Sequence, residues 1–172
     1  MYFIHIPKTG GTSVTRALYK RNLLTPYHKR YPIHTSIRDI DHIDFSKPIV
    51  TCVRNPYDRF HSLYNFFIKI KYGLDISFEE FVSKYNKEYH GKYLYDTQMN
   101  YITIDGKIVA TDILRFEHLE EDWAKLCKKY KINIELEHVR KVDKTGIVYT
   151  HEMKNVMKSI FAEDFKNFGY SV

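Results

Sequence analysis

The sequence predicts an α/β fold, a three-layer α/β/α sandwich around a mostly parallel central sheet. Short apolar segments typical of buried strands alternate with longer segments whose apolar residues recur at helical spacing. The 172 residues contain no internal repeat, no composition break and no linker rich in proline, glycine or serine. We therefore expect one domain over residues 1–172, with ligands at the carboxyl ends of the strands.

In the first half of the chain, three apolar segments predict strands, and the segments after them predict helices. Pro56 directly follows the third strand and suits the first turn of a helix. The helix that it begins carries an apolar stripe at helical spacing, which indicates a core-facing side. The expected strands are 1–6, Tyr31–His34 and 48–53, and the expected helices are 12–21, one from near Ser36, and 56–71.

In the second half, Ser77 followed by Glu80 has the spacing of a capping box, which opens a short helix through about Tyr85. Asp105-Gly106 predicts a tight turn in a small hairpin. The remaining expected elements are the hairpin arms 100–104 and 107–110, a strand at 112–116, and helices at 119–130, 152–161 and 163–168.

The first expected strand leads into a segment with the character of an anion-binding loop, His5-Ile6-Pro7-Lys8-Thr9-Gly10-Gly11-Thr12-Ser13. Glycines allow main-chain N–H groups to turn inward, and the helix that follows offers the positive end of its dipole. Lys8, Thr12 and Ser13 can add donors. Because Lys8 precedes the glycines, the loop is not a Walker A motif, and an ordinary ATP or GTP site is disfavoured.

A second anion site is expected after the third strand, where Arg54-Asn55-Pro56-Tyr57-Asp58-Arg59-Phe60-His61-Ser62 follows at once. Arg54 then lies at the carboxyl end of the strand, and Ser62 lies two turns into the helix. Such a pair could bind a second phosphate from two sides.

Together these segments resemble the 5'-phosphosulfate and 3'-phosphate motifs of sulfotransferases that use 3'-phosphoadenosine 5'-phosphosulfate (PAPS). The closest resemblance is to the branch with many carbohydrate sulfotransferases, whose signatures run close to HIPKTGGTS and VRNPYDRxxSxYN. Weaker similarity continues through His34-Thr35-Ser36, Arg115-Phe116-Glu117 and the C-terminal segment. The resemblance implies a P-loop-like phosphosulfate-binding loop and transfer of a sulfuryl group from PAPS to a hydroxyl or amine of a carbohydrate acceptor.

The resemblance also implies roles for individual residues. Lys8 is expected at the bridging oxygen between phosphate and sulfate, as a catalytic group, and His34 is expected to be the general base. His5 alternates with apolar neighbours in the first expected strand, which favours a structural role, and His28, His42 and Glu117 are alternative bases. The expected PAPS-binding residues are Lys8, Thr9, Gly10, Gly11, Thr12, Ser13, Arg54, Ser62, Lys144 and Thr145.

The amino-acid composition says less about the binding partners than the two motifs do. A net charge of +6 favours polyanions, among them PAPS, an acidic glycan or nucleic acid. No nucleic-acid-binding signature is present, so that partner is disfavoured. The histidines and two cysteines lack metal-ligand spacing, so no metal is expected, and Cys52 and Cys127 are interpreted as buried thiols.

The sequence suggests neither a basic-then-apolar leader nor an apolar segment long enough to span a bilayer. Animal members of the family that it resembles are usually anchored in the secretory pathway, so the resemblance implies a compact microbial or viral form in the cytoplasm. The oligomeric state is left open. An alternative function is a non-catalytic module that binds PAPS, its product 3'-phosphoadenosine 5'-phosphate (PAP) or another nucleotide. Lys8 favours an enzyme over such a module, because binding alone does not require an ammonium at the bridging oxygen.

Overall fold

The computed structural model describes residues 1–66, 75–88, 96–137 and 148–172. The chain forms two compact units, each built from two stretches of sequence. The first unit comprises Met1–Arg54 and Gln98–Val139, and the second comprises Asn55–Thr97 and Arg140–Val172.

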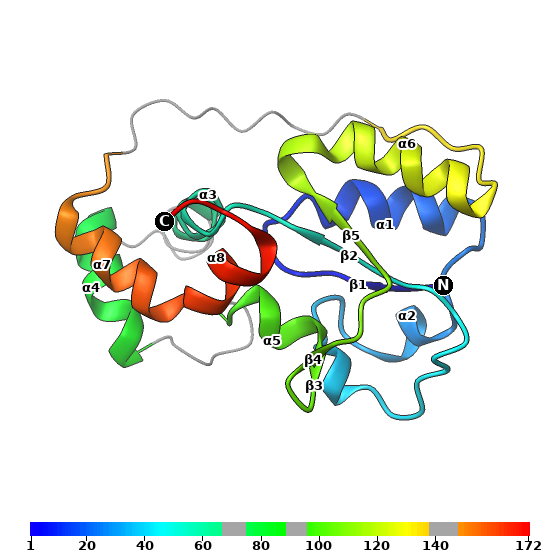
Figure 1. Ribbon diagram of the computed structural model, residues 1–172, viewed down its shortest axis with the longest axis horizontal. Helices are drawn as coiled ribbons and strands as arrows, with labels where there is room; N and C mark the ends of the chain where they lie inside the picture. Colours follow the sequence, from blue (N-terminus) through cyan, green and yellow to red (C-terminus); the bar gives the residue numbers. More distant parts are fainter. Residues whose placement is uncertain (67–74, 89–95, 138–147) are drawn as a thin grey trace. The chain divides into compact units, whose positions relative to one another are not determined.

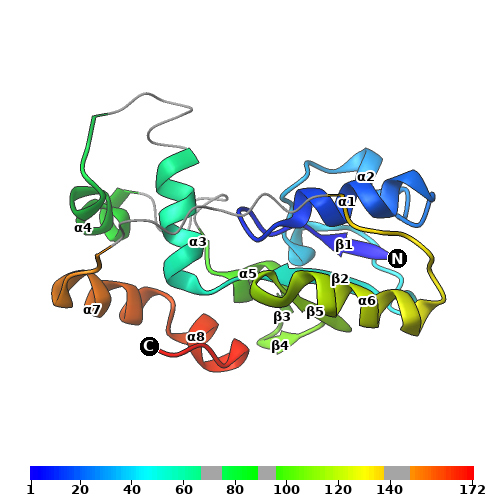
Figure 2. The same cartoon turned by 90° about the horizontal axis from the view of Figure 1, so that it is seen from above.

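A parallel three-stranded sheet is the centre of the first unit. Its strands are β1 (Tyr2–Ile4), β2 (Ile49–Val53) and β5 (Asp112–Arg115). Strand β2 lies between the other two, as Figure 2 shows, and pairs in parallel with both. The predicted α/β class with a parallel sheet is confirmed, and β2 is buried along its whole length, as expected for a central strand.

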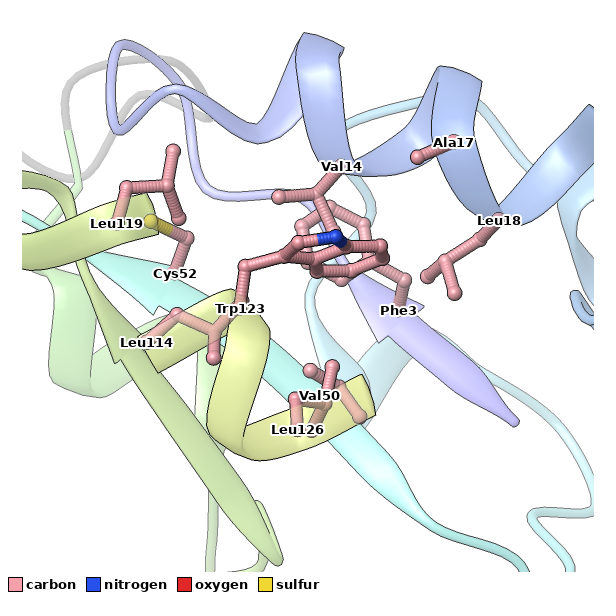
Figure 3. Packing of buried hydrophobic residues seen from close by; sticks show 10 residues of the cluster. All are labelled: Phe3, Val14, Ala17, Leu18, Val50, Cys52, Leu114, Leu119, Trp123 and Leu126. Carbon is pink, nitrogen blue, oxygen red and sulfur yellow. The ribbon is translucent and has the colours of Figure 1, made fainter. Parts of the chain in front are cut away.

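Helices α1 (Gly11–Lys20) and α6 (Leu119–Tyr130) pack on one face of this sheet (Figure 1). Alternate strand residues point toward them, because successive side chains of a strand face opposite sides. Figure 3 shows the ring of Trp123 stacked among these side chains, and its indole N–H donates to the Ile134 carbonyl at 2.8 Å. The cluster consists of Phe3, Val14, Ala17, Leu18, Val50, Cys52, Leu114, Leu119, Trp123 and Leu126.

The other face carries shorter elements: α2 (Tyr27–Arg30), the 3₁₀ turn η1 (Ile37–Asp39), α5 (Gln98–Ile102) and a hairpin of β3 (Thr103–Ile104) and β4 (Lys107–Ile108) (Figure 1). The hairpin turn at Asp105-Gly106 is confirmed, with φ of 49° and 74°. Its first arm is shorter than predicted, because residues up to Ile102 are helical.

The strand predicted at Tyr31–His34 is wrong. The segment is a turn in which the main-chain N–H and the hydroxyl of Thr35 both donate to the Pro32 carbonyl, at 3.1 and 2.8 Å. Pro32 also lacks the N–H that a strand interior needs. The helix predicted from Ser36 is only the turn η1, because the Ser36 hydroxyl donates to the Asn100 carbonyl at 2.8 Å instead of capping a helix.

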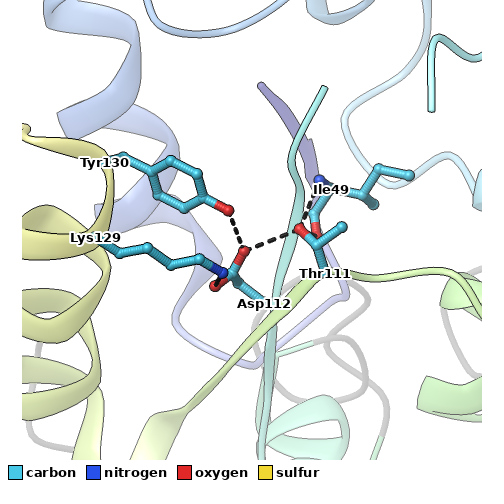
Figure 4. A network of polar contacts seen from close by, with 5 residues as sticks. All are labelled: Ile49, Thr111, Asp112, Lys129 and Tyr130. Carbon is cyan, nitrogen blue, oxygen red and sulfur yellow. Dashed lines mark hydrogen bonds and ion pairs between the residues drawn. The ribbon is translucent and has the colours of Figure 1, made fainter. Parts of the chain in front are cut away.

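A polar network joins the amino-terminal end of β5 to the end of α6 (Figure 4). The Asp112 carboxylate accepts bonds from Lys129 and Tyr130, each at 2.5 Å, and from Thr111 at 2.9 Å. Burial opposes ionisation of Asp112, but these hydrogen bonds outweigh it and lower its pKa. The Thr111 hydroxyl also accepts the Ile49 N–H at 3.1 Å, and the Thr111 main-chain N–H donates to the Ile49 carbonyl at 2.8 Å, so the network fixes the start of β5 beside β2.

The second unit is helical, with α3 (Pro56–Leu63), α4 (Phe78–Glu88), α7 (His151–Ile160) and α8 (Ala162–Phe168). The predicted helix starts are confirmed: Asn55 caps α3 through the N–H of Tyr57 at 3.0 Å, and Ser77 accepts from Glu80 at 3.1 Å. The core consists of Phe60, Leu63, Tyr64, Phe81, Val82, Met153, Met157, Phe161 and Phe165. In the described ranges, no helix has the length and apolar character needed to cross a bilayer.

Candidate anion-binding and transfer site

The anion-binding residues predicted after the first and third strands, Lys8 and Arg54 among them, lie at one edge of the first unit's sheet. Since β1, β2 and β5 are parallel, their carboxyl ends meet at the same edge. The loop after β1 carries Lys8, β2 is followed by Arg54, and β5 is followed by Phe116. The architecture therefore brings together groups that lie more than a hundred residues apart.

The loop between β1 and α1 has an unusual and well-supported main chain. Lys8 and Gly10 both have positive φ, 65° and 84°. The Thr9 hydroxyl donates to the Ile6 carbonyl at 2.9 Å, and the Cys52 thiol donates to the Thr9 carbonyl at 2.8 Å. Burial raises the pKa of Cys52, so this thiol stays protonated. Thr9 is fully buried, and its side chain and carbonyl both support the loop.

Helix α1 begins at Gly11 with its N-terminus at this loop. Gly10, which has no side chain, occupies the N-cap position, and the first turn contains no acidic residue. Thr12 is exposed and Ser13 is half-buried. Because the first N–H groups of a helix have no partner within the helix, this end can bind an anion with main-chain and hydroxyl donors.

Two close approaches explain why glycines occupy positions 10 and 11. A Cβ at Gly11 would lie 2.3 Å from Cδ2 of His5, and a Cβ at Gly10 would lie 2.7 Å from Cδ2 of Phe116. Both distances are shorter than non-bonded carbon atoms allow. The glycines thus let the start of α1 pack directly against one ring that follows β1 and another that follows β5.

Arg54 is buried and held on several sides. Its guanidinium carbon lies 4.3 Å from the centroid of the Phe116 ring, and its Nη1 donates to the Lys8 carbonyl at 3.3 Å. A guanidinium over an aromatic face is stabilised by a cation–π interaction. The loop, the end of β2 and the residue after β5 are therefore linked through one side chain.

The electrostatics of this edge favour a bound anion. Burial, and then the positive charge of Arg54, lower the pKa of Lys8 below that of an ordinary lysine. Two cations therefore lie close to each other and to the positive end of α1. A phosphate or sulfate group there would interact favourably with all three, which fits the chemistry that the sequence predicts.

His34 lies on the turn before η1, and its ring is half-buried. Its Nδ1 is 2.8 Å from the main-chain oxygen of His5, and the two rings meet edge to face at 4.6 Å. Because a carbonyl oxygen only accepts hydrogen bonds, Nδ1 carries the proton in the neutral ring, and the lone pair is on Nε2. That tautomer is the one a general base needs.

The other histidines near β1 are positioned as structural groups. His5 is buried beside Gly11, and burial, with the charges of His34 and His28, lowers its pKa to about 3. Nε2 of His28 accepts the N–H of Phe3 at 3.2 Å, and burial with the N-terminal charge lowers its pKa to about 4. Glu117 and His42, the remaining alternative bases, are exposed.

We expect the protein to lose stability as the pH falls from about 6.5 to 5. Both His5 and His28 have lowered pKa values, so the unfolded chain binds protons that the folded chain excludes. Full stability is present above the unfolded value of about 6.5, and each group costs up to about 2 kcal/mol by pH 5. Urea unfolding at pH 7.5 and 5 measures this loss.

Replacing His28 with glutamine, whose oxygen can still accept the Phe3 N–H, should remove about one proton from the pH slope. Replacing the exposed His42 with asparagine is the matched control and should leave the slope as it is. Equal free energies of unfolding at both pH values for the parent would contradict the prediction.

The remaining predicted binding residues belong to the second unit or fall outside the described residues. Ser62 is a buried residue of α3 in the second unit, so its joint binding of one phosphate with Arg54 stays a prediction. Lys144 and Thr145 fall outside the described residues. Arg59, also in the second unit, is buried and donates to the Asp96 carbonyl at 2.9 Å, which is a structural role.

Two residues at the site had no place in the expected binding set, Phe116 and Gln98. Phe116 belongs to the weakly similar segment after β5, and its contacts with Gly10 and Arg54 depend on the sheet order β1-β2-β5. Gln98 is fully buried at the start of α5, in a stretch for which the sequence predicted no helix or strand. A glutamine outside any motif offers no local signal of such a contact.

Comparison with known families agrees with this geometry. The profile of the sulfotransferase family matches residues 1–171. The chain belongs to the sulfotransferase family. No curated protein and no solved structure matches this sulfotransferase significantly. Membership supports transfer of a sulfuryl group as the general activity of the chain.

Proposed function

We propose that this chain is an enzyme that transfers the sulfuryl group of PAPS to a hydroxyl or amine of a carbohydrate acceptor. The observation that carries the proposal is that the Arg54 guanidinium donates to the Lys8 carbonyl at 3.3 Å, next to the N-terminus of α1, and that its charge lowers the pKa of Lys8. Placing two cations together costs free energy, and an anionic ligand offsets that cost. PAPS, with its phosphosulfate and 3'-phosphate, supplies two anionic groups.

In this proposal the main chain of Gly10 and Gly11 and the hydroxyls of Thr12 and Ser13 bind the 5'-phosphate. Arg54 binds the 3'-phosphate together with Ser62. Lys144 and Thr145, which follow much later in the sequence, also bind the nucleotide. Residues 1–172 then act as one sulfotransferase domain, as the match over 1–171 supports. The three-layer sandwich and the P-loop-like character of the loop belong to the same proposal.

The ammonium of Lys8 stabilises charge on the oxygen that leaves sulfur, and Nε2 of His34 accepts the proton of the acceptor group. The acceptor oxygen or nitrogen forms a bond to sulfur as the bond between sulfur and the donor's phosphate oxygen breaks, and PAP leaves with the electron pair. The nearest physical template is phosphoryl transfer, in which positioning and charge stabilisation dominate. We assign no metal to this site.

Nucleotide binding is tested first, with PAP as the probe. At a hundred times its dissociation constant, PAP should add about 2.7 kcal/mol of apparent stability. The readout is the thermal unfolding of the protein with PAP, with ATP and without nucleotide. A clear shift with ATP and none with PAP would overturn the assignment of PAPS as donor.

Transfer of labelled sulfate from PAPS to a panel of glycans distinguishes the enzyme from the alternative, a module that only binds nucleotide. Both would bind PAP, but only the enzyme labels an acceptor. Lys8 favours catalysis, because binding alone does not require an ammonium beside the leaving oxygen. The acceptor class and the cytoplasmic location stay predictions, as does the exclusion of nucleic acid as a partner.

A further inference from the structure

Gln98 contacts the main chain of Arg54 at two points. The Arg54 N–H donates to Oε1 of Gln98 at 2.8 Å, and Nε2 of Gln98 donates to the Arg54 carbonyl at 2.8 Å. Gln98 is fully buried, so this carboxamide is shielded from competing water. Two short, buried hydrogen bonds to one residue define its position closely.

The contact between Gln98 and Arg54 lies just beyond the last residue pair of β2 and β5. The ladder between β2 and β5 ends at the pair Val53 and Arg115, so Arg54 is the first residue beyond it. The Gln98 carboxamide, with one donor and one acceptor, matches the N–H and C=O that a neighbouring strand would otherwise pair. It therefore extends the strand's hydrogen bonding by one residue without a further strand.

We propose that Gln98 is a positioning residue that sets the affinity of Arg54 for the 3'-phosphate of the nucleotide. With its main chain held by Gln98, Arg54 keeps its guanidinium on the Phe116 ring and near the Lys8 carbonyl. An arginine has several rotatable bonds, and ordering it before binding removes that entropic cost from binding. This inference rests on the proposed function, because it takes PAP as the ligand.

The test is a double-mutant cycle with Gln98→Met and Arg54→Ala. Methionine has a similar volume and removes both hydrogen bonds. The dissociation constants of PAP and of adenosine 5'-phosphate, which lacks the 3'-phosphate, are measured by calorimetry. Arg54→Ala should weaken PAP about ten- to a hundredfold. Gln98→Met should weaken the binding of PAP about tenfold and leave the binding of adenosine 5'-phosphate unchanged. The magnitude is taken from residues that orient metal ligands, whose loss typically weakens binding by about that factor.

The cycle separates positioning from a general loss of structure. In the Arg54→Ala background, Gln98→Met should have no further effect on PAP, because the side chain that it orders is gone. Thr51→Val is the matched control: it removes a buried bond from the same strand, the hydroxyl of Thr51 to the Ile4 carbonyl at 2.8 Å, and should leave the preference for PAP unchanged.

Several results would overturn the proposal. They are an unchanged preference for PAP in Gln98→Met, an equal loss for both nucleotides, or an undiminished loss in the Arg54→Ala background. If Gln98→Met does not fold, Gln98→Asn, one methylene shorter, replaces it, and faster hydrogen exchange at the Arg54 amide is required as well. A parent protein that does not bind PAP overturns the proposed function and this inference together, whereas a parent that binds PAP isolates the role of Gln98.

Discussion

Replacing Lys8 with alanine should lower kcat about 10²- to 10³-fold and lower the affinity for PAP much less. The reason is that charge on the leaving oxygen grows only in the transition state, where the ammonium acts. Lys8 already has a lowered pKa from burial and from the charge of Arg54. In the free protein its proton is therefore lost at a lower pH than in an ordinary lysine, and kcat/KM of the parent, which reports the free enzyme, should begin to fall at a lower pH than an ordinary lysine would cause.

Lys8→Ala can be compared directly with the parent, because it leaves the backbone preference at position 8 nearly the same. Lys8 has φ of 65°, and alanine keeps the Cβ and therefore the same left-handed cost, so the loop is not relieved of strain. Steady-state kinetics, PAP calorimetry and urea unfolding are measured on the same preparations. If affinity for PAP drops as far as kcat does, Lys8 is an anchor for the bound nucleotide and has no special role in the transition state.

Replacing His34 with alanine should lower kcat about 10²- to 10⁴-fold with normal binding of PAP. The His5 carbonyl holds the proton on Nδ1, so Nε2 of the neutral ring can accept the acceptor's proton. The parent's kcat should rise with pH as the ring loses its proton, because only the neutral form is a base. A series of kcat values across pH, for parent and variant, measures both effects.

His34→Asn separates the base from a structural role. The asparagine NH₂ can still donate to the His5 carbonyl, but the amide cannot take up a proton at neutral pH. We therefore expect this variant to be as slow as His34→Ala and to lack the rising limb. Turnover near the parental level in a folded His34→Asn or His34→Ala protein would eliminate His34 and direct attention to Glu117 or to a base on the acceptor itself. His28 is less suited, since its Nε2 already accepts the Phe3 N–H.

Local sequence signals predicted the elements whose causes are local. Pro56 begins α3, Ser77 caps α4, and Asp105-Gly106 forms the hairpin turn, because each of these features acts within a few residues. The strand predicted at Tyr31–His34 was wrong because a local signal was overlooked. Pro32 disfavours a strand interior, and its carbonyl accepts the hydrogen bonds of a turn.

The sequence by itself determined the family-like motifs of this protein, its α/β class and the chemical character of Lys8, Arg54 and His34. These features depend only on which residue types lie close together along the chain. Only the tertiary structure decided which groups meet. The parallel order β1-β2-β5 brings Phe116 onto Arg54 and Gly10, and the fold places Gln98 on the Arg54 main chain. Such contacts join residues more than forty positions apart, and they follow from how strands pair and side chains are buried rather than from any local pattern.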